Sequence, residues 1–304
     1  MTAKRIRDLS GTFKITCPAK VNLGLKVVGR REDGYHLLKM VMEPVSLFDV
    51  LSLRVSSAPS PVVTLQCPDI PGLKTGDNLV IKAARKMLAM AAARGIDTAA
   101  GFSFFLDKQI PVGAGLGGGS SDAAATLLLL NALLSLELSL SELQALAIDL
   151  GADVPFFLQP ELCLVEGIGE RLSPLSPPHR RWYVLLKPPF AINTSWAYKK
   201  LNYELTNNKY NINMRQFFQP VCEREKYSLF NDFEEVIFSE FQQLDEIKQW
   251  FMGRREVRGA LMSGSGSAVY AVFSAYEPTV QAYKEACARW GGSGWLVFLV
   301  HNLL

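Results

Sequence analysis

A glycine-rich stretch at residues 111–122, PVGAGLGGGSSD, has the composition of an anion-binding loop. Five glycines lie within seven positions, and a long apolar pattern of helical character follows directly. Glycine lets the backbone adopt positive φ and approach a ligand closely. Free N–H groups at a helix N-terminus favour negative charge. Ser120 or Ser121 could cap this helix, and their hydroxyls could reach a phosphate or its metal ion. The stretch therefore predicts a phosphate-binding loop.

Known types of phosphate loop fit this stretch to different degrees. The Walker loop needs a lysine directly after the glycines, and none stands there. The protein-kinase loop needs a valine where Ser120 stands. The dinucleotide pattern G-x-G-x-x-G is met at positions 113, 115 and 118, with Glu137 farther along. However, residues 108–111 separate the preceding strand pattern from the glycines, and Glu137 lies among helix-forming residues. A dinucleotide site therefore stays open as an alternative.

Three further segments carry residues that could do chemistry. Lys20 lies in an apolar context, PAKVNL, so its ammonium must reach water or a partner such as a phosphate or a carboxylate. Asp153 follows a helix pattern in GADVPFF and is either a base or an ordinary turn residue. The turn signal Asp33-Gly34 is followed by Tyr35 and His36, which would display an aromatic ring and an imidazole at a loop or strand start.

The bulk properties limit the classes of function. The 304 residues are enough for two domains, and the formal net charge is +3 without a long basic block. This balance gives little support to nucleic-acid binding but suits phosphorylated small molecules. The five cysteines are not in C-x-x-C spacing, which favours separate reduced thiols over a zinc cluster or a disulfide framework.

The chain shows no sign of export or membrane insertion. The N-terminus lacks an apolar signal-peptide region. The most apolar run, residues 123–138, is interrupted by Asn131 and Glu137 and is shorter than the ~20 residues that a membrane span requires. We therefore expect a cytoplasmic protein without a membrane partner.

The periodicity predicts an alternation of strands and helices. Two strands at 12–17 and 21–28 are separated by a break at Pro18, and later strands are expected at 41–55, 62–66, 101–106, 161–166, 182–188, 268–274 and 295–300. Helices are expected at 77–93, after the glycine loop to about 136, from a Ser139–Glu142 capping box to 150, after Thr194 or Ser195, at 233–251 and at 278–290. The linker-like residues 173–181 predict domains at 1–172 and 173–304, whereas residues 203–230 remain unassigned.

Four segments resemble the GHMP kinase superfamily, which includes galactokinase, homoserine kinase and mevalonate kinase, and they occur in the same order. They are the Lys20 segment, the glycine loop, Gly-Ala-Asp153-Val-Pro, and a second glycine–serine turn at residues 263–267. The resemblance implies an α+β fold of two domains. The N-terminal domain would be ribosomal-protein-S5-like and the C-terminal domain ferredoxin-like, with the active site in the cleft between them. A monomer or weak homodimer is expected.

Within the superfamily, the chain resembles most the kinases that phosphorylate the 2-hydroxyl of a cytidine-diphosphate-linked methylerythritol in the non-mevalonate isoprenoid pathway. That resemblance makes Asp153 the general base, with Lys20 beside it to keep it ionised and to stabilise charge on the γ-phosphate. It assigns substrate binding to Asn22, Tyr35, His36, Thr194 and Tyr198, with the tyrosines stacking on cytosine and the imidazole reading its polar edge.

The same resemblance implies ATP as co-substrate, together with Mg²⁺. The implied ATP-binding residues are Lys108 at the edge of the adenine pocket, then Pro111, Val112, Gly113, Ala114, Gly115, Leu116, Gly117, Gly118, Gly119, Ser120 and Ser121, and in the second turn Gly264, Ser265 and Gly266. The two serines could also touch Mg²⁺, but no carboxylate is assigned to the metal.

Rival functions remain open at this point. Another GHMP kinase, of homoserine or mevalonate type, would share the ATP loop without a cytosine site. A nicotinamide-dependent dehydrogenase would bind NAD at the same loop. A non-catalytic relative that senses a ligand would be expected to lack Lys20 or Asp153, and both residues are present.

Overall fold

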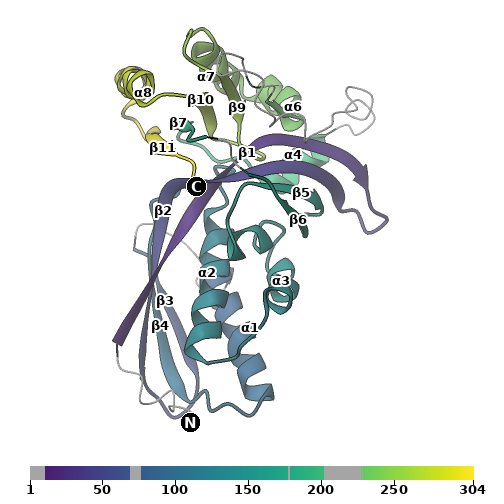
Figure 1. The fold of residues 1–304 in the computed structure, drawn as a ribbon, viewed down its shortest axis with the longest axis vertical. Helices are drawn as coiled ribbons and strands as arrows, with labels where there is room; N and C mark the ends of the chain where they lie inside the picture. Colours follow the sequence, from purple (N-terminus) through teal and green to yellow (C-terminus); the bar gives the residue numbers. More distant parts are fainter. Residues whose placement is uncertain (1–10, 69–76, 177–178, 202–226, 228) are drawn as a thin grey trace. The chain divides into compact units, whose positions relative to one another are not determined.

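The computed structural model describes residues 11–68, 77–176, 179–201, 227 and 229–304 (Figure 1). The chain divides into two compact units, each assembled from three separate stretches. Unit 1 comprises Met1–Ala19, Leu47–Ile110 and Gly117–Pro160, and unit 2 comprises Lys20–Ser46, Pro111–Leu116 and Glu161–Leu304. The domain boundary expected at residues 172–173 stays a prediction.

Two long strands, β1 (Gly11–Arg30) and β2 (His36–Ser57), each contribute residues to both units. The predicted break at Pro18 is wrong, because β1 continues through this residue. A proline has a φ close to that of an extended chain and removes only its own N–H donor, so it does not by itself end a strand. The turn between the strands is closed by the Arg31 N–H, which donates to the Tyr35 carbonyl at 2.7 Å.

Unit 1 combines strands with helices on one side of them (Figure 1). The second half of β2 pairs antiparallel with β4 (Ala100–Asp107), which pairs parallel with β3 (Val62–Gln66). The helices are α1 (Leu79–Ala93), α2 (Gly118–Leu133) and α3 (Leu140–Ile148), and α1 packs against α2. The predicted capping box of Ser139 and Glu142 is confirmed at the start of α3. A short 3₁₀ helix, η3 (Pro155–Leu158), follows.

Unit 2 contains a four-stranded antiparallel sheet in the order β11 (Leu296–His301), β7 (Trp182–Lys187), β10 (Val269–Phe273), β9 (Gly259–Met262). Helix α7 (Gln242–Met252) packs on β9 and β10, and α8 (Tyr276–Trp290) packs on β7 and β11. The first half of β2 pairs with β5 (Cys163–Gly167), which pairs with β6 (Arg171–Pro174), whereas β8 (Phe230–Asn231) pairs with β1. The predicted α+β class is confirmed.

Some predicted element ends in unit 2 are wrong. Helix α4 (Thr194–Lys200) is capped by Asn193, whose Oδ1 accepts the Trp196 N–H at 2.9 Å, and not by Thr194 or Ser195. The single helix expected at 233–251 is two helices, α6 (Phe233–Glu240) and α7, because Phe241 leaves the helical conformation with φ −125° and ψ 69°. Of the unassigned residues 203–230, all but 227, 229 and 230 lie outside the described part of the chain.

A buried polar cluster in unit 2 centres on Glu43, which is fully buried. Arg181 donates to its carboxylate through Nε at 3.2 Å and through a terminal nitrogen at 2.5 Å. The Tyr183 hydroxyl and Asn302 Nδ2 also donate to it. Burial, and after it the Glu43 carboxylate, raises the pKa of Tyr183 well above its usual value, so the phenol keeps its proton. The cluster, defined as these four residues, joins β2, β7 and the chain end after β11.

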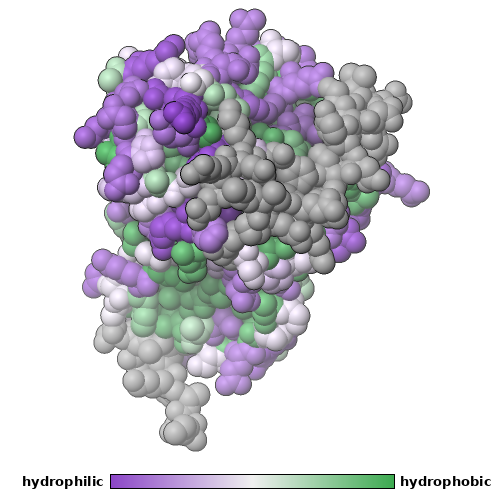
Figure 2. All heavy atoms as spheres, turned by 45° about the horizontal axis from the view of Figure 1, so that its top comes forward, coloured by the Kyte–Doolittle hydropathy of each residue, from purple (hydrophilic) through white to green (hydrophobic). Residues whose placement is uncertain are grey.

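The surface of the described part is mixed in polarity. Figure 2 shows hydrophilic residues over much of one face and a group of exposed hydrophobic residues in the lower part of the view. Large hydrophobic side chains that remain exposed include Tyr35, Val62, Phe105 and Val112. Among the described helices, none combines the length and the hydrophobicity that crossing a bilayer would need.

Candidate active site

The glycine loop leads directly into helix α2. Gly117, with φ +73°, is the N-cap of α2, and no side chain caps the helix. The predicted cap by Ser120 or Ser121 is therefore wrong, because both serines lie inside the first turn. A helix start without a side-chain cap leaves its first N–H groups available for a ligand. A helix start without a side-chain cap therefore suits an anion site better than a helix start capped by a serine would.

Two glycines of the loop are required by close packing within unit 2. Gly115 has φ +75°, and a Cβ added there would lie 1.9 Å from the carbonyl oxygen of Ser263. Gly113 has φ +63°, and its added Cβ would lie 2.6 Å from Cβ of Ala191. Any side chain at Gly115 would thus collide with backbone, so the first loop and the second glycine–serine turn approach each other only because this residue is glycine.

Hydrogen bonds connect the loop to the second turn. The Ser263 hydroxyl donates to the Gly115 carbonyl at 2.9 Å, and the Ala268 N–H donates to the Ala114 carbonyl at 3.1 Å. Within the turn, Gly264 and Gly266 have φ of +56° and +86°. The sequence analysis predicts that the glycine loop and the second turn belong to one ATP site. The structure brings residues 111–116 of the loop, which lie in unit 2, into contact with this turn.

Lys20 and Asn22 on β1 join the same network. The Lys20 N–H donates to the Leu116 carbonyl at 2.9 Å, and the Asn22 N–H donates to the Ser263 hydroxyl at 3.4 Å. The Lys20 ammonium donates to Asn22 Oδ1 at 2.5 Å, and both side chains are buried. The alternative of Lys20 as an exposed surface residue is therefore wrong. A buried ammonium needs strong acceptors nearby, which suits a site for anionic groups.

Asn231 is a structural contributor that the sequence interpretation missed. Its Nδ2 donates to the carbonyls of Met262 at 2.8 Å and Gly264 at 2.7 Å, so it holds the second turn. Its Oδ1 accepts the Phe233 N–H at 3.0 Å. A polar residue between Phe230 and Phe233 was the only available signal, and it does not reveal partners about thirty positions away. Within the turn, Ser265 shares a hydroxyl–hydroxyl hydrogen bond of 3.0 Å with Thr194.

Of the three ring side chains predicted to bind cytosine, His36 and Tyr198 stack on each other. The rings of His36 and Tyr198 stack with centroids 4.9 Å apart, and Tyr198 meets Phe233 edge-on at 4.8 Å. Tyr35 is 61% exposed, so its ring is accessible to a flat ligand. Burial, and after it the Arg30 charge, lowers the pKa of His36, which favours the neutral imidazole. A neutral imidazole has one donor and one acceptor nitrogen.

Unit 1 contains the predicted site residues Asp153 and Lys108, as well as residues 117–121 of the glycine loop. Asp153 is half-buried in the turn before η3, where the Val154 N–H donates to the Gly151 carbonyl at 3.0 Å. Its pairing with Lys20 stays a prediction. The side chain of Lys108 is buried, and its ammonium donates to the carboxylates of Asp49 and Asp122.

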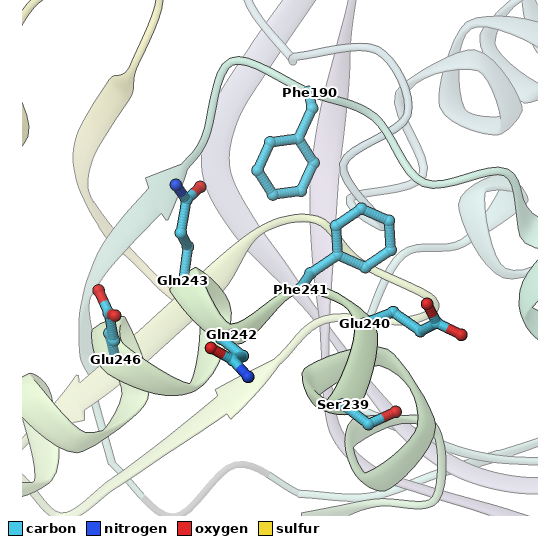
Figure 3. Close-up of a pocket in the computed structure, with 7 residues that line it drawn as sticks. All are labelled: Phe190, Ser239, Glu240, Phe241, Gln242, Gln243 and Glu246. Atoms are coloured by element: carbon cyan, nitrogen blue, oxygen red, sulfur yellow. The ribbon is translucent and has the colours of Figure 1, made fainter.

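Unit 2 also contains an open pocket of about 340 Å³ (Figure 3). Phe190 and Phe241 stack in it with centroids 5.2 Å apart, surrounded by polar side chains of α6 and α7. The pocket is lined by Phe190, Ser239, Glu240, Phe241, Gln242, Gln243 and Glu246. The predicted ligand-binding residues are not among this set.

Comparisons with known proteins agree with the arrangement. Residues 78–160 match the family model for the GHMP kinases N terminal domain, and residues 214–291 match the model for the GHMP kinases C terminal domain. The 4-diphosphocytidyl-2-C-methyl-D-erythritol kinase of Syntrophotalea carbinolica is 41% identical, covering 93% of this chain and 96% of its own. The enzyme of that name from Pelobacter propionicus is 40% identical, covering 96% and 99%. This chain belongs to the 4-diphosphocytidyl-2-C-methyl-D-erythritol kinase family of GHMP kinases.

Solved structures agree with this membership. A crystal structure of 4-(cytidine 5'-diphospho)-2C-methyl-D-erythritol kinase matches with a TM-score of 0.78 at 36% identity, covering 95% of this chain and 99% of the other. A homoserine kinase from Cytophaga hutchinsonii shares the fold with a TM-score of 0.70 at 17% identity, covering 96% and 95%. As a member of the 4-diphosphocytidyl-2-C-methyl-D-erythritol kinase family, the chain is a kinase that uses ATP and a small-molecule substrate. The dehydrogenase alternative is therefore not retained.

Proposed function

We propose that this kinase transfers the γ-phosphoryl group of ATP to the 2-hydroxyl of 4-diphosphocytidyl-2-C-methyl-D-erythritol. The main support is the hydrogen-bonded assembly of Lys20, Asn22, the glycine loop and the second turn within unit 2. It occurs in a chain about 40% identical over nearly its full length to relatives named for that substrate. We further propose that the enzyme acts in the cytoplasm as a monomer or weak homodimer.

Phosphoryl transfer needs a base, a cation near the transferred group and donors for the phosphates. In this proposal the Asp153 carboxylate takes the proton from the 2-hydroxyl, the hydroxyl oxygen bonds to the γ-phosphorus, and the bond to the β,γ-bridging oxygen breaks to release ADP. Lys20 stabilises charge on the transferred group. Asn22, whose amide already accepts from the Lys20 ammonium, binds the substrate near the reacting hydroxyl, together with Thr194.

The phosphates of ATP are proposed to lie against the backbone N–H groups of residues 113–121, with Gly264, Ser265 and Gly266 completing the site. The first turn of α2 carries no side-chain cap, so its N–H groups are suited to bind oxygen atoms.

Mg²⁺ is the cofactor implied for this reaction. Its usual ligands are hard oxygen atoms and nucleotide phosphates. The Ser121 hydroxyl is buried and has no hydrogen-bond partner within the described residues, so the first turn of α2 fits the ion. Ser121 would hold it together with Ser120 and the phosphates. When bound, Mg²⁺ neutralises charge that develops on the phosphate oxygens.

A coupled ADP-release assay tests the proposed function. The enzyme is given MgATP with 4-diphosphocytidyl-2-C-methyl-D-erythritol, homoserine or mevalonate in parallel reactions. We expect turnover with the cytidine compound only. Turnover with one of the other alcohols would retain the kinase chemistry and discard the cytosine site, whereas absence of turnover with all three would contradict the proposal.

Replacing Tyr35 by alanine should raise the KM for the cytidine substrate and leave the KM for ATP nearly unchanged. The exposed ring offers a stacking face, and base–aromatic stacking contributes about 1–3 kcal/mol, or about 5- to 150-fold in KM. Tyr35→Phe should retain most of the affinity. Tyr276→Ala is the matched control, because Tyr276 is 48% exposed and its ring meets Trp182, which is not a predicted site residue, in a tilted arrangement with centroids 4.7 Å apart. Equal changes in both KM values would contradict the cytosine assignment.

A further inference from the structure

The surroundings of Lys108 point to a role other than direct contact with ATP. Its ammonium donates to Asp49 Oδ2 and, at 2.9 Å, to Asp122 Oδ2. The side chains of Lys108, Asp49 and Asp122 are 6%, 0% and 3% exposed. All three lie in unit 1. The charge of Lys108 is therefore directed at two carboxylates, and almost none of its side chain reaches the surface.

Asp49 connects the three charged side chains to the backbone of the segment before the glycine loop. Its Oδ1 accepts the N–H groups of Gln109 at 2.6 Å and Ile110 at 2.8 Å. These two residues connect β4 to the glycine loop. Because Asp49 has two backbone donors besides Lys108, its carboxylate would keep hydrogen-bond partners without the lysine.

Asp122 connects the group to the phosphate-binding end of α2. It lies in the helix that begins at Gly118, one residue after Ser121. A carboxylate near the start of a helix interacts well with the helix dipole but repels phosphate groups bound at the same end. The Lys108 ammonium, 2.9 Å from Asp122 Oδ2, is the cation that compensates the charge of this carboxylate. The Cys17 thiol beside them stays protonated, because burial and then Asp122 raise its pKa.

Gly118 shows how closely the lysine approaches the helix start. A Cβ added at this glycine would lie 3.0 Å from the Lys108 ammonium nitrogen and 2.9 Å from Cγ2 of Ile110. The ammonium thus packs directly against the first residue of α2. Loss of the ammonium would therefore leave the Asp122 carboxylate uncompensated beneath the N–H groups that we assign to the phosphates.

We propose that Lys108 is a positioning residue that acts on ATP through Asp122, by neutralising this carboxylate and holding the first turn of α2 in place. The inference rests on the proposed function, because it takes the ATP phosphates to bind at residues 113–121. It replaces the expected contact between Lys108 and the adenine pocket with an indirect role.

A double-mutant cycle tests this inference with the full chain. The variants are Lys108→Met, Asp122→Asn and the double substitution, and the readouts are the Kd of a non-hydrolysable ATP analogue by calorimetry and the KM for ATP. We expect Lys108→Met alone to weaken ATP binding by at least about tenfold, which is about 1.4 kcal/mol. In the Asp122→Asn background the same change should alter Kd less than about twofold. An equal loss in both backgrounds would overturn the inference and indicate direct contact with ATP.

The design remains decisive if one variant does not fold. Lys108→Met leaves two carboxylates buried together and could prevent folding, which circular dichroism would reveal. The comparison of Asp122→Asn with the double variant then suffices, because direct contact predicts a large loss there and the indirect role predicts little. If the unmodified enzyme does not bind the ATP analogue, the proposed function fails. If it binds but Lys108 and Asp122 are not coupled, only this inference fails.

Discussion

Replacing Asp153 by asparagine should lower kcat by about 10²- to 10⁴-fold, which is the usual contribution of a positioned general base. Asparagine has nearly the same shape as aspartate but cannot take the proton from the substrate hydroxyl. Asp153 is half-buried in the turn before η3, and the backbone hydrogen bond from Val154 to Gly151 does not involve its side chain. Because the two side chains have nearly the same shape, the variant should fold normally and bind ATP with unchanged affinity.

The measurement is ADP release at saturating concentrations of both substrates, together with ATP-analogue binding and thermal unfolding. Asp149→Asn provides the matched control. Asp149 is four positions earlier, its side chain is 63% exposed, and it pairs with Lys86 on α1. We expect the control to keep kcat within about twofold, since an exposed ion pair contributes little. A kcat near that of the unmodified enzyme in Asp153→Asn would remove this residue as the base.

Replacing Glu43 by alanine should lower the free energy of unfolding by about 3–5 kcal/mol. Removing one partner of a buried ion pair leaves the other charge buried without compensation. Here the uncompensated group is the Arg181 guanidinium, and the Tyr183 hydroxyl and Asn302 Nδ2 also lose their acceptor. Because the cluster joins strands β2 and β7 to the chain end, the loss should affect unit 2 as a whole.

Urea unfolding followed by circular dichroism measures this effect. Glu166→Ala is the control, because the Glu166 side chain on β5 is 36% exposed and its Oε1 lies 3.6 Å from the Nζ of Lys39, which is on β2 like Glu43. We expect a change of about 0–1 kcal/mol there. Adding Arg181→Met to Glu43→Ala should recover part of the stability by removing the unpaired charge. Equal losses in the Glu43 and Glu166 variants would show that the buried cluster does not stabilise unit 2 as described.

Features set by neighbouring residues could be predicted from the sequence. The Ser139–Glu142 capping box is a local spacing, and the structure contains it. The start of α1 at Asn78 is equally local, since its side chain accepts the Val80 N–H at 2.8 Å. The glycine loop could be recognised because close approach and positive φ demand glycine, as at Gly115. The functional roles of the individual residues remain predictions.

Features set by distant partners could not be predicted in this way. The sequence shows Lys108 as a cation before the loop, but its acceptor Asp49 is 59 positions earlier. Glu43 and Arg181 are 138 positions apart, and neither has a local pattern that indicates burial. Pairings of this kind depend on the assembled tertiary structure, so the residue types alone do not identify the partners.

Each compact unit is assembled from three separate stretches of the chain, and this has a consequence for the exchange of segments between homologous genes. A single recombination crossover near residue 172 would take residues 20–46 and 111–116 of unit 2 from one parent and residues 173–304 from the other. Glu43 and Arg181, or Gly115 and Ser263, would then come from different parents. We expect functional chimaeras to arise mainly between parents that carry the same residues at these positions, or from several crossovers that transfer a unit whole.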